Sequence, residues 1–277
     1  MSLLTLFGEE TVLIIILGYL YWGRNKELGE RICISLLTAT TVCPILKNIF
    51  LRLRPYFVVS EIKCLNPVAE GDIYDVRLQG YSFPSAHTAS AASAYGTLAK
   101  KNRKMWTRII LDMLTAGVAI SRFSLGVHYP TDVIAGAVIG LVSMTLGGMI
   151  STSDRKLHYA LLAALCSPGL LLCTTEDYFT CYGIMCGVLS GILYERDHIR
   201  FSSTDSLLVT AARILCGTAT FAAVVNMLKI PVALIAGNAN ERLLLCCRSV
   251  RYAAASFVTV GLCPYVFSRL DQIFSKN

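Results

Sequence analysis

Three short segments of the sequence place charged or ionisable side chains at the ends of apolar stretches. These segments are Lys47 to Pro55, Phe83 to His87, and Ser121 to Asp132. Ionisable groups near membrane helices are costly to keep and are usually functional. The cations Lys47, Arg54 and Arg122 suit a dianionic phosphoryl group, because arginine forks two phosphate oxygens and lysine acts as a point charge. We therefore predict that these three residues bind phosphate.

Two histidines in the same segments supply the chemistry that cations cannot. A neutral imidazole can attack phosphorus, and a second imidazole can protonate the departing oxygen. Asp132 lies four residues after His128, so in a helical turn its carboxylate can hold one ring N–H and fix the tautomer. We predict His128 as the nucleophile and His87 as the acid that later becomes the base, with Ser85 assisting phosphate binding near a helix start.

Each of these residues also has a purely structural interpretation. Lys47 and Arg54 could be snorkelling anchors, His87 could cap a helix, and Arg122 could form a structural ion pair with Asp132. The combination of six residues in three neighbouring segments favours a site: Lys47, Arg54, His87, Arg122, His128 and Asp132.

The composition predicts a membrane protein. The chain has 277 residues, 55% hydrophobic and 16% charged, with mean hydropathy +0.58, which is more apolar surface than a soluble core of this length can bury. Spans of about 20 residues cross the bilayer. The apolar runs, about nine, are Thr11–Gly23, Ile32–Phe50, Ser85–Ala99, Ile109–Leu125, Val133–Ile150, Leu157–Cys173, Phe179–Tyr194, Leu207–Leu228 and Ala253–Phe267.

The expected fold is therefore all-α, a polytopic transmembrane helical bundle. Residues 1–150, with the first five helices, would form a catalytic membrane core. Residues 151–277 would add further transmembrane helices that complete the same membrane domain. Small residues at Gly136 and Gly140 and at Ala92 and Gly96 favour close helix packing in lipid.

The distribution of basic residues predicts which side each connection faces. The most basic connection, Lys100 to Arg108, belongs in the cytoplasm by the positive-inside rule. Alternation then places residues 24–31, 154–156 and 195–200 on the same side. It places all three chemical segments on the opposite side, which is the periplasm, the cell exterior or an organelle lumen. The connection Tyr56–Phe83 also falls there, as a binding segment or lid or as a solvated linker.

Other partners are not indicated. The 11 cysteines lie mostly inside apolar runs, with no CxxC pair and no His/Cys cluster at zinc spacing, so we expect no metal, no cofactor and no disulfide framework. The net charge of +7 is explained by membrane topology, and we expect no nucleic-acid partner. The oligomeric state cannot be inferred.

The three segments resemble the type 2 phosphatidic acid phosphatase superfamily, whose pattern is K-x6-RP, PSGH and SR-x5-H-x3-D. Lys47 to Arg54-Pro55, Pro84 to His87, and Ser121-Arg122 to His128 and Asp132 reproduce all three spacings. The resemblance covers Lys47–Gly140 and nothing diagnostic beyond about residue 150. It implies a phosphohistidine at His128 and no metal requirement. Ala86 departs from the usual glycine, and its methyl could narrow the pocket or alter the backbone.

The predicted function is thus metal-independent hydrolysis of a phosphomonoester or pyrophosphate on a lipid or isoprenoid, at the extracytoplasmic membrane face. Two alternatives remain open at this stage. One is a transporter of lipids or organophosphates, and the other is a catalytically silent protein that binds phospholipid, for which Ala86 is the only sequence support. The substrate and the host membrane are not encoded in any motif that we recognise.

Overall fold

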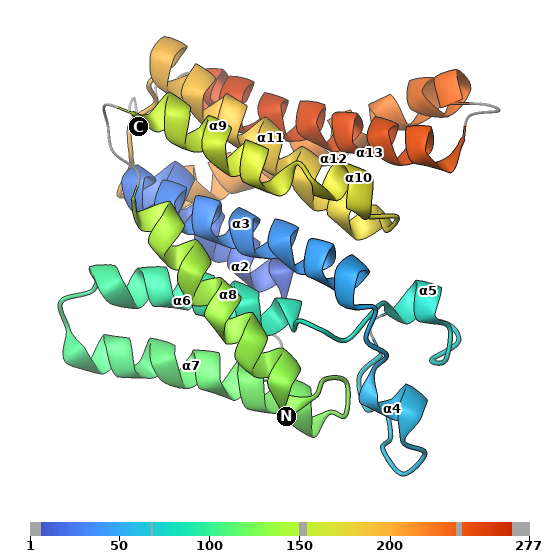
Figure 1. The fold of residues 1–277 in the computed structure, drawn as a ribbon. Helices are drawn as coiled ribbons and strands as arrows, with labels where there is room; N and C mark the ends of the chain where they lie inside the picture. Colours follow the sequence, from blue (N-terminus) through green and yellow to red (C-terminus); the bar gives the residue numbers. More distant parts are fainter. Residues whose placement is uncertain (1–6, 68, 150–153, 237–239, 268–277) are drawn as a thin grey trace. The chain divides into compact units, whose positions relative to one another are not determined.

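The computed structural model describes residues 7–67, 69–149, 154–236 and 240–267, and every regular element within these ranges is a helix (Figure 1). The all-α prediction is therefore confirmed. The chain divides into two compact units. Unit 1 comprises residues 1–14 and 31–149, and unit 2 comprises residues 15–30 and 150–277. The boundary predicted between residues 150 and 151 lies outside the described residues.

Unit 1 carries the chemical segments. Its helices are most of α3 (Lys26–Phe50), the short α4 (Pro55–Val58) and α5 (Val76–Gln79), and then α6 (Ala86–Lys101), α7 (Met105–Ser124) and α8 (Pro130–Gly148). In Figure 1, α6 and α7 run side by side and α8 crosses them. Pro44 lies inside α3, and Pro130 occupies the first turn of α8, where its missing N–H costs nothing.

Unit 2 is formed by an early segment and by the whole second half of the chain. The early segment includes the end of α2 (Glu10–Gly18), the π-helix η1 (Tyr19–Arg24) and the start of α3. The later elements are α9 (Arg155–Cys166), α10 (Gly169–Leu172), α11 (Glu176–His198), α12 (Leu207–Ala236), α13 (Glu241–Phe257) and the π-helix η2 (Val258–Leu262).

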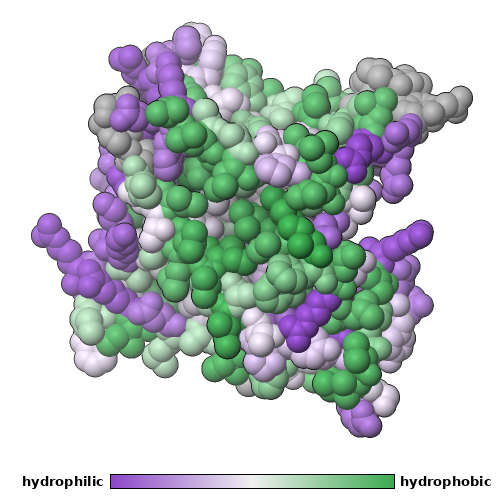
Figure 2. Space-filling view, in the orientation of Figure 1, coloured by the Kyte–Doolittle hydropathy of each residue, from purple (hydrophilic) through white to green (hydrophobic). Residues whose placement is uncertain are grey.

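Each of the nine predicted apolar runs falls on one of these helices or on a helix with its short continuation. Among the described residues, four segments are long and apolar enough to cross a membrane: Lys26–Val58, Pro130–Gly148, Leu207–Lys229 and Glu241–Phe267. Apolar side chains such as Ile110, Met113, Val138 and Leu215 stand exposed on the helix surfaces. Figure 2 shows apolar residues over much of the visible face. A multi-pass integral membrane protein exposes such surface to lipid.

α6 is the central helix of unit 1. Nearly all its residues from Thr88 to Tyr95 are buried, and they are small: alanine, serine and threonine predominate. Its buried hydroxyls are satisfied locally, since Ser93 donates to the Ser90 carbonyl and Thr97 to the Ser93 carbonyl. Small residues let neighbouring backbones approach closely, so α6 can be enclosed on several sides despite its modest hydropathy.

Two glycines of α8 create the closest contact with α6. A Cβ on Gly136 would lie 2.4 Å from the Ser85 carbonyl oxygen, and one on Gly140 would lie 2.5 Å from the Ala89 carbonyl oxygen. Only glycine tolerates such distances to backbone atoms. The expected packing role of this glycine pair is thus confirmed. The contact brings the first turns of α6 and α8 together, where His87 and Asp132 are found.

Unit 2 is tied together by buried charges. The Glu30 carboxylate accepts hydrogen bonds from the Tyr159 hydroxyl and from Arg196, and it pairs with Arg155 Nε at 2.9 Å. Lys26 Nζ lies 2.5 Å from Glu195 Oε2. These groups come from three of the connections predicted to share one membrane side. The same ion pairs explain why residues 15–30 belong with the second half of the chain.

Glycines also set the packing between α11 and α13. A Cβ on Gly183 or on Gly187 would lie 2.2 Å from the carbonyl oxygen of Ser249 or of Ala253, respectively. The spacing of four residues puts both on one face of α11. Backbone-to-backbone contact of this kind suits helix association in lipid, where no hydrophobic force drives helices together.

We predict that Gly136→Ala destabilises the protein by roughly 1–3 kcal/mol, because the added methyl forces α8 away from the Ser85 carbonyl. Gly148→Ala is the matched control on the same helix, since only Lys100 Nζ lies as near as 4.0 Å to the added Cβ. Thermal unfolding in detergent measures both. Equal melting temperatures for the two variants would contradict the packing role of Gly136.

Candidate active site

The structure brings all the predicted site residues together in unit 1. Lys47 lies in the last turn of α3 and Arg122 in the last turn of α7. His87 lies in the first turn of α6, and Asp132 in the first turn of α8. Lys47, Arg54, Arg122 and His128 all act electrostatically on the His87 ring. The convergence inferred from alternation of the helices is therefore present in the structure.

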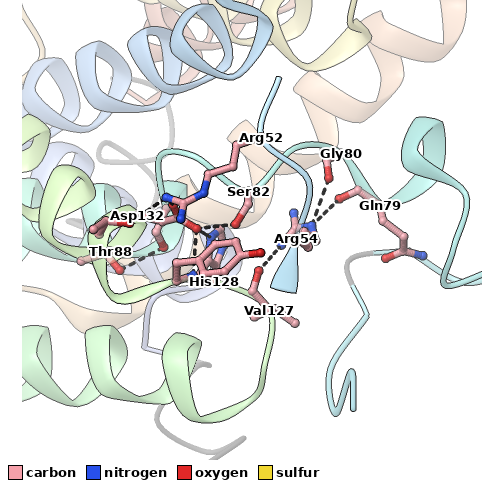
Figure 3. Close-up of polar contacts among 12 residues, drawn as sticks. Arg52, Arg54, Gln79, Gly80, Ser82, Thr88, Val127, His128 and Asp132 are labelled. Atoms are coloured by element: carbon pink, nitrogen blue, oxygen red, sulfur yellow. Dashed lines mark hydrogen bonds and ion pairs between the residues drawn. The ribbon is translucent and has the colours of Figure 1, made fainter. Parts of the chain in front are cut away.

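Arg54 is buried and held by backbone carbonyls. Its Nε donates to the carbonyls of Gln79, at 3.0 Å, and Gly80, at 3.1 Å, while Nη1 donates to the Val127 carbonyl at 3.1 Å (Figure 3). Arg54 is 2% exposed. The residue thus joins the connection Tyr56–Phe83 to the segment just before His128, in addition to placing a positive charge in the site.

Arg122 is equally buried, at 2% exposure, but it is not satisfied in the same way. Within the part of the chain that the structure describes, its Nε and Nη1 have no hydrogen-bond partner. The Arg54 guanidinium acts on it as a like charge. A buried cation with unpaired donors is costly unless an anion compensates it, so these donors indicate an anion-binding site.

His128 lies in the connection between α7 and α8 and is 3% exposed. Its Nδ1 is 3.5 Å from Asp132 Oδ2, an ion-pair distance without hydrogen-bond geometry. Burial lowers the pKa of His128 to about 3, with Asp132 opposing the shift and Arg54, Arg122 and Lys47 adding to it. The ring is therefore neutral at neutral pH, which is the form that carries a nucleophilic lone pair.

Asp132 accepts hydrogen bonds at both of its carboxylate oxygens. Its Oδ2 accepts hydrogen bonds from the Ser82 hydroxyl and, at 2.9 Å, from the Tyr129 backbone N–H. Its Oδ1 accepts one from Arg52 Nη1 at 2.9 Å. The bond to Tyr129 also caps the first turn of α8, as acidic residues at this helix position commonly do. One fully buried carboxylate thus caps α8 and faces His128 (Figure 3).

Ser85 and Ala86 begin α6. The Ser85 backbone N–H donates to the Asp132 carbonyl at 3.0 Å, and its hydroxyl lies 3.0 Å from that of Thr88. Ala86, which replaces the usual glycine, packs against a buried cluster of Ala39, Cys43 and Ala89. The extra methyl therefore contributes to the apolar packing between α3 and α6.

The turn before His128 depends on one glycine. Gly126 has φ of +73°, and a Cβ there would lie 2.6 Å from the Lys63 carbonyl oxygen. Both the backbone conformation and the close approach require glycine. On either side of it, Leu125 and Val127 pack with Tyr56 in a buried apolar cluster. The connection Tyr56–Phe83 is thus packed against the segment that carries His128.

Sequence reasoning missed two polar residues of the site, Arg52 and Ser82. Arg52 stands two residues before Arg54 in a stretch without helical structure, and alternate residues of an extended segment face the same way. That spacing could have indicated it. Ser82 had no such signal, because its role depends on how the preceding connection folds. Among the described residues, no group of three or more His, Cys, Asp or Glu is placed to hold a metal ion.

Comparison with known proteins finds several named proteins that are similar to this chain. The chain is 30% identical over 142 residues to an undecaprenyl-diphosphatase of Sulfolobus acidocaldarius, covering 50% of this chain and 64% of the relative. It is 30% identical over 131 residues to a lipid A 4'-phosphatase of Bacteroides thetaiotaomicron, covering 47% and 56%. It is also 30% identical over 141 residues to phosphatidylglycerophosphatase B of Bacillus subtilis, covering 47% and 62%.

The chain therefore spans less than two thirds of each of these relatives. No solved structure matches it. Residues 30–152 match the model of the PAP2 superfamily, and residues 179–275 match that of the PAP2 superfamily phosphatase transmembrane extension. The first match contains every residue of the site described above, and the second covers α12 and α13 and most of α11 in unit 2. With the two matches and the three spacings of the site, the chain belongs to the PAP2 superfamily.

Proposed function

We propose that this protein is a metal-independent phosphatase that hydrolyses a phosphomonoester or pyrophosphate of a lipid or isoprenoid through a phosphohistidine at His128. The observation that carries this proposal is the buried Arg122 guanidinium, whose Nε and Nη1 have no hydrogen-bond partner among the described residues. A phosphoryl dianion supplies both the charge and the acceptor oxygens that these donors lack. The positive charges of Arg54 and Lys47 act on both histidines and complete the cationic surroundings.

The first step forms the phosphoenzyme. With Asp132 Oδ2 facing His128 Nδ1 at 3.5 Å and orienting its N–H, the lone pair of Nε2 attacks phosphorus and the bond from phosphorus to the leaving oxygen breaks. His87 donates a proton to that oxygen, and the alcohol or phosphate departs. The dianion itself favours a protonated His87, because it offsets the positive charges of Lys47, Arg54 and Arg122 that act on this ring.

The second step releases phosphate. His87, now neutral, accepts a proton from a water molecule, and the water oxygen attacks phosphorus while the bond to His128 Nε2 breaks. The cations stabilise the charge on the equatorial oxygens in both steps. Phosphate leaves, and both histidines return to their starting states.

The names of the relatives and the membrane setting support this substrate class. All three relatives are named for phosphate or diphosphate removal from lipid-linked substrates. The candidate membrane span Lys26–Val58 contains Arg54 close to its end, which supports a site at a membrane boundary. A lipid headgroup can reach it there while the chain stays in the bilayer.

We further propose that the site opens to the extracytoplasmic side. The ends of α3 and α7 and the starts of α6 and α8 meet at the site, which agrees with the alternation from the basic connection of residues 100–108. In unit 2, residues 24–31, 154–156 and 195–200 meet through Glu30 and Glu195. That grouping supports the same alternation.

We predict that detergent-purified protein in EDTA releases phosphate from at least one of phosphatidate, phosphatidylglycerophosphate, sphingosine phosphate, undecaprenyl diphosphate and glucose 6-phosphate. His128→Ala should lower kcat by about 10³-fold or more, because no other group can replace the nucleophile. Asp132→Asn should leave residual activity through a misoriented ring.

His198→Ala is the matched control, since His198 is an exposed histidine of unit 2, and its activity should equal that of the wild type. Wild-type turnover by His128→Ala would refute the mechanism. An absence of release from every substrate would refute the phosphatase itself.

The predicted orientation can be tested with a reporter enzyme that is active only outside the cytoplasm. Inserted after Gly71, in the connection Tyr56–Phe83, it should be active. Inserted after Asn102, in the basic connection, it should be inactive. The reverse pattern would place the site on the cytoplasmic side.

A further inference from the structure

Beyond the residues of the three motif spacings, we infer that Arg52 is a positioning residue for the nucleophile. It fixes both oxygens of the Asp132 carboxylate, one through its side chain and the other through Ser82. This inference rests on the proposed function, because Asp132 has a catalytic consequence only if His128 attacks.

The side chain of Arg52 makes the first connection. Its Nη1 donates to Asp132 Oδ1 at 2.9 Å and to Thr131 Oγ1 at 2.7 Å. Its guanidinium lies over the Tyr129 ring, 3.9 Å from the centroid. Two hydrogen bonds and a ring contact hold a side chain that is otherwise 38% exposed, so the guanidinium has one defined place beside α8.

The backbone of Arg52 makes the second connection. Its carbonyl accepts a hydrogen bond from the Ser82 N–H at 2.7 Å. The hydroxyl of the same serine donates to Asp132 Oδ2. Arg52 therefore reaches Oδ1 directly and Oδ2 through one intermediate residue (Figure 3). A carboxylate anchored at both oxygens cannot rotate away from His128 Nδ1.

The position of Arg52 also argues against direct contact with the leaving group. It lies on the Asp132 side of His128, behind the ring nitrogen that faces the carboxylate. In an in-line displacement, the leaving oxygen departs on the side opposite the nucleophile. Arg52 is thus placed to act on the nucleophile through Asp132, whereas His87 serves the departing oxygen.

The residue type fits this role better than lysine would. A planar guanidinium can stack on a ring and donate in its plane at the same time, and a lysine ammonium cannot do both. The backbone just before Arg52 is strained, since Leu51 has φ of +48°. In a residue other than glycine this conformation costs about 1 kcal/mol or more. That left-handed residue ends α3 and turns the chain toward α8.

The test compares Arg52→Gln with Arg77→Gln in the detergent-purified full-length protein. Arg77 is exposed in α5 of the same connection, so its substitution makes the same charge change near the same side of unit 1. We expect Arg52→Gln to lower kcat by about 10- to 100-fold, as loss of an orienting partner typically does. KM should change by less than about 3-fold. Arg77→Gln should match the wild type.

Two further readouts separate positioning from a merely structural role. In the Asp132→Asn background, Arg52→Gln should cause no additional loss of kcat, because both act through one carboxylate.

Removing the positive charge of Arg52 also makes the pair of His128 and Asp132 easier to protonate. The acid limb of kcat/KM should therefore move to higher pH. The other charged groups around the pair, Lys47, Arg54, Arg122 and His87, stay unchanged, as does Glu9, which acts on Arg122.

The outcomes are distinguishable from failure of the proposed function. If the wild type releases no phosphate, the proposed function fails. If the wild type is active and Arg52→Gln raises KM at unchanged kcat, or adds its full loss to Asp132→Asn, Arg52 does not act by positioning Asp132. Should Arg52→Gln not fold, Arg52→Lys keeps the charge. Arg52→Lys should then show a lowered kcat, and the acid limb of its kcat/KM profile should stay where it is in the wild type. A wild-type kcat in Arg52→Lys would overturn the inference.

Discussion

The site of this protein is governed by an imbalance of buried charge. Arg54 and Arg122 are each 2% exposed, while Asp132 is the one carboxylate that is buried among the described residues of unit 1. Two nitrogens of Arg54 donate hydrogen bonds to backbone carbonyls. The Asp132 carboxylate accepts hydrogen bonds from Arg52, Ser82 and Tyr129. Among the described residues, Arg122 Nε and Nη1 have no hydrogen-bond partner. A buried cation with unpaired donors is costly unless an anion compensates it, so the site is arranged around an acceptor that the described residues do not supply to these donors.

The surrounding architecture holds this arrangement in place without neutralising it. Gly136 and Gly140 let α8 lie against the backbone of α6, which sets the distance between their first turns. Gly126 allows the turn that delivers His128. Burial then keeps the His128 imidazole neutral. Arg54 and Arg122 stay charged because the intrinsic pKa of a guanidinium is so high. A neutral nucleophile beside fixed cations is the combination that attack on a phosphoryl dianion needs.

Much of this could be predicted from sequence, because the spacings within each motif are local. Lys47 and Arg54, and likewise His128 and Asp132, are near neighbours in the chain, and alternation of spans brings their segments to one side. Arg52 and Ser82 could not be predicted in the same way, since their contacts depend on how the connection Tyr56–Phe83 returns to α8. That connection was predicted as a lid or binding segment or as a solvated linker. In the structure its residues 79 and 80 hold Arg54, and so it helps to build the site. The sequence also did not predict that residues 15–30 belong to unit 2. Their place there depends on ion pairs between residues far apart in sequence, such as that of Lys26 with Glu195.

The most direct test of the central claim is whether an inorganic anion binds to the protein through the guanidinium of Arg122. Thermal unfolding of the purified protein should be measured with and without orthovanadate or inorganic phosphate, for the wild type, Arg122→Gln and the control Arg108→Gln at the other end of α7. Ligand at 100 times its Kd stabilises a single site by about 2.7 kcal/mol. The account predicts such stabilisation in the wild type and in Arg108→Gln and its loss in Arg122→Gln. Equal stabilisation in all three proteins, or none in the wild type, would contradict it.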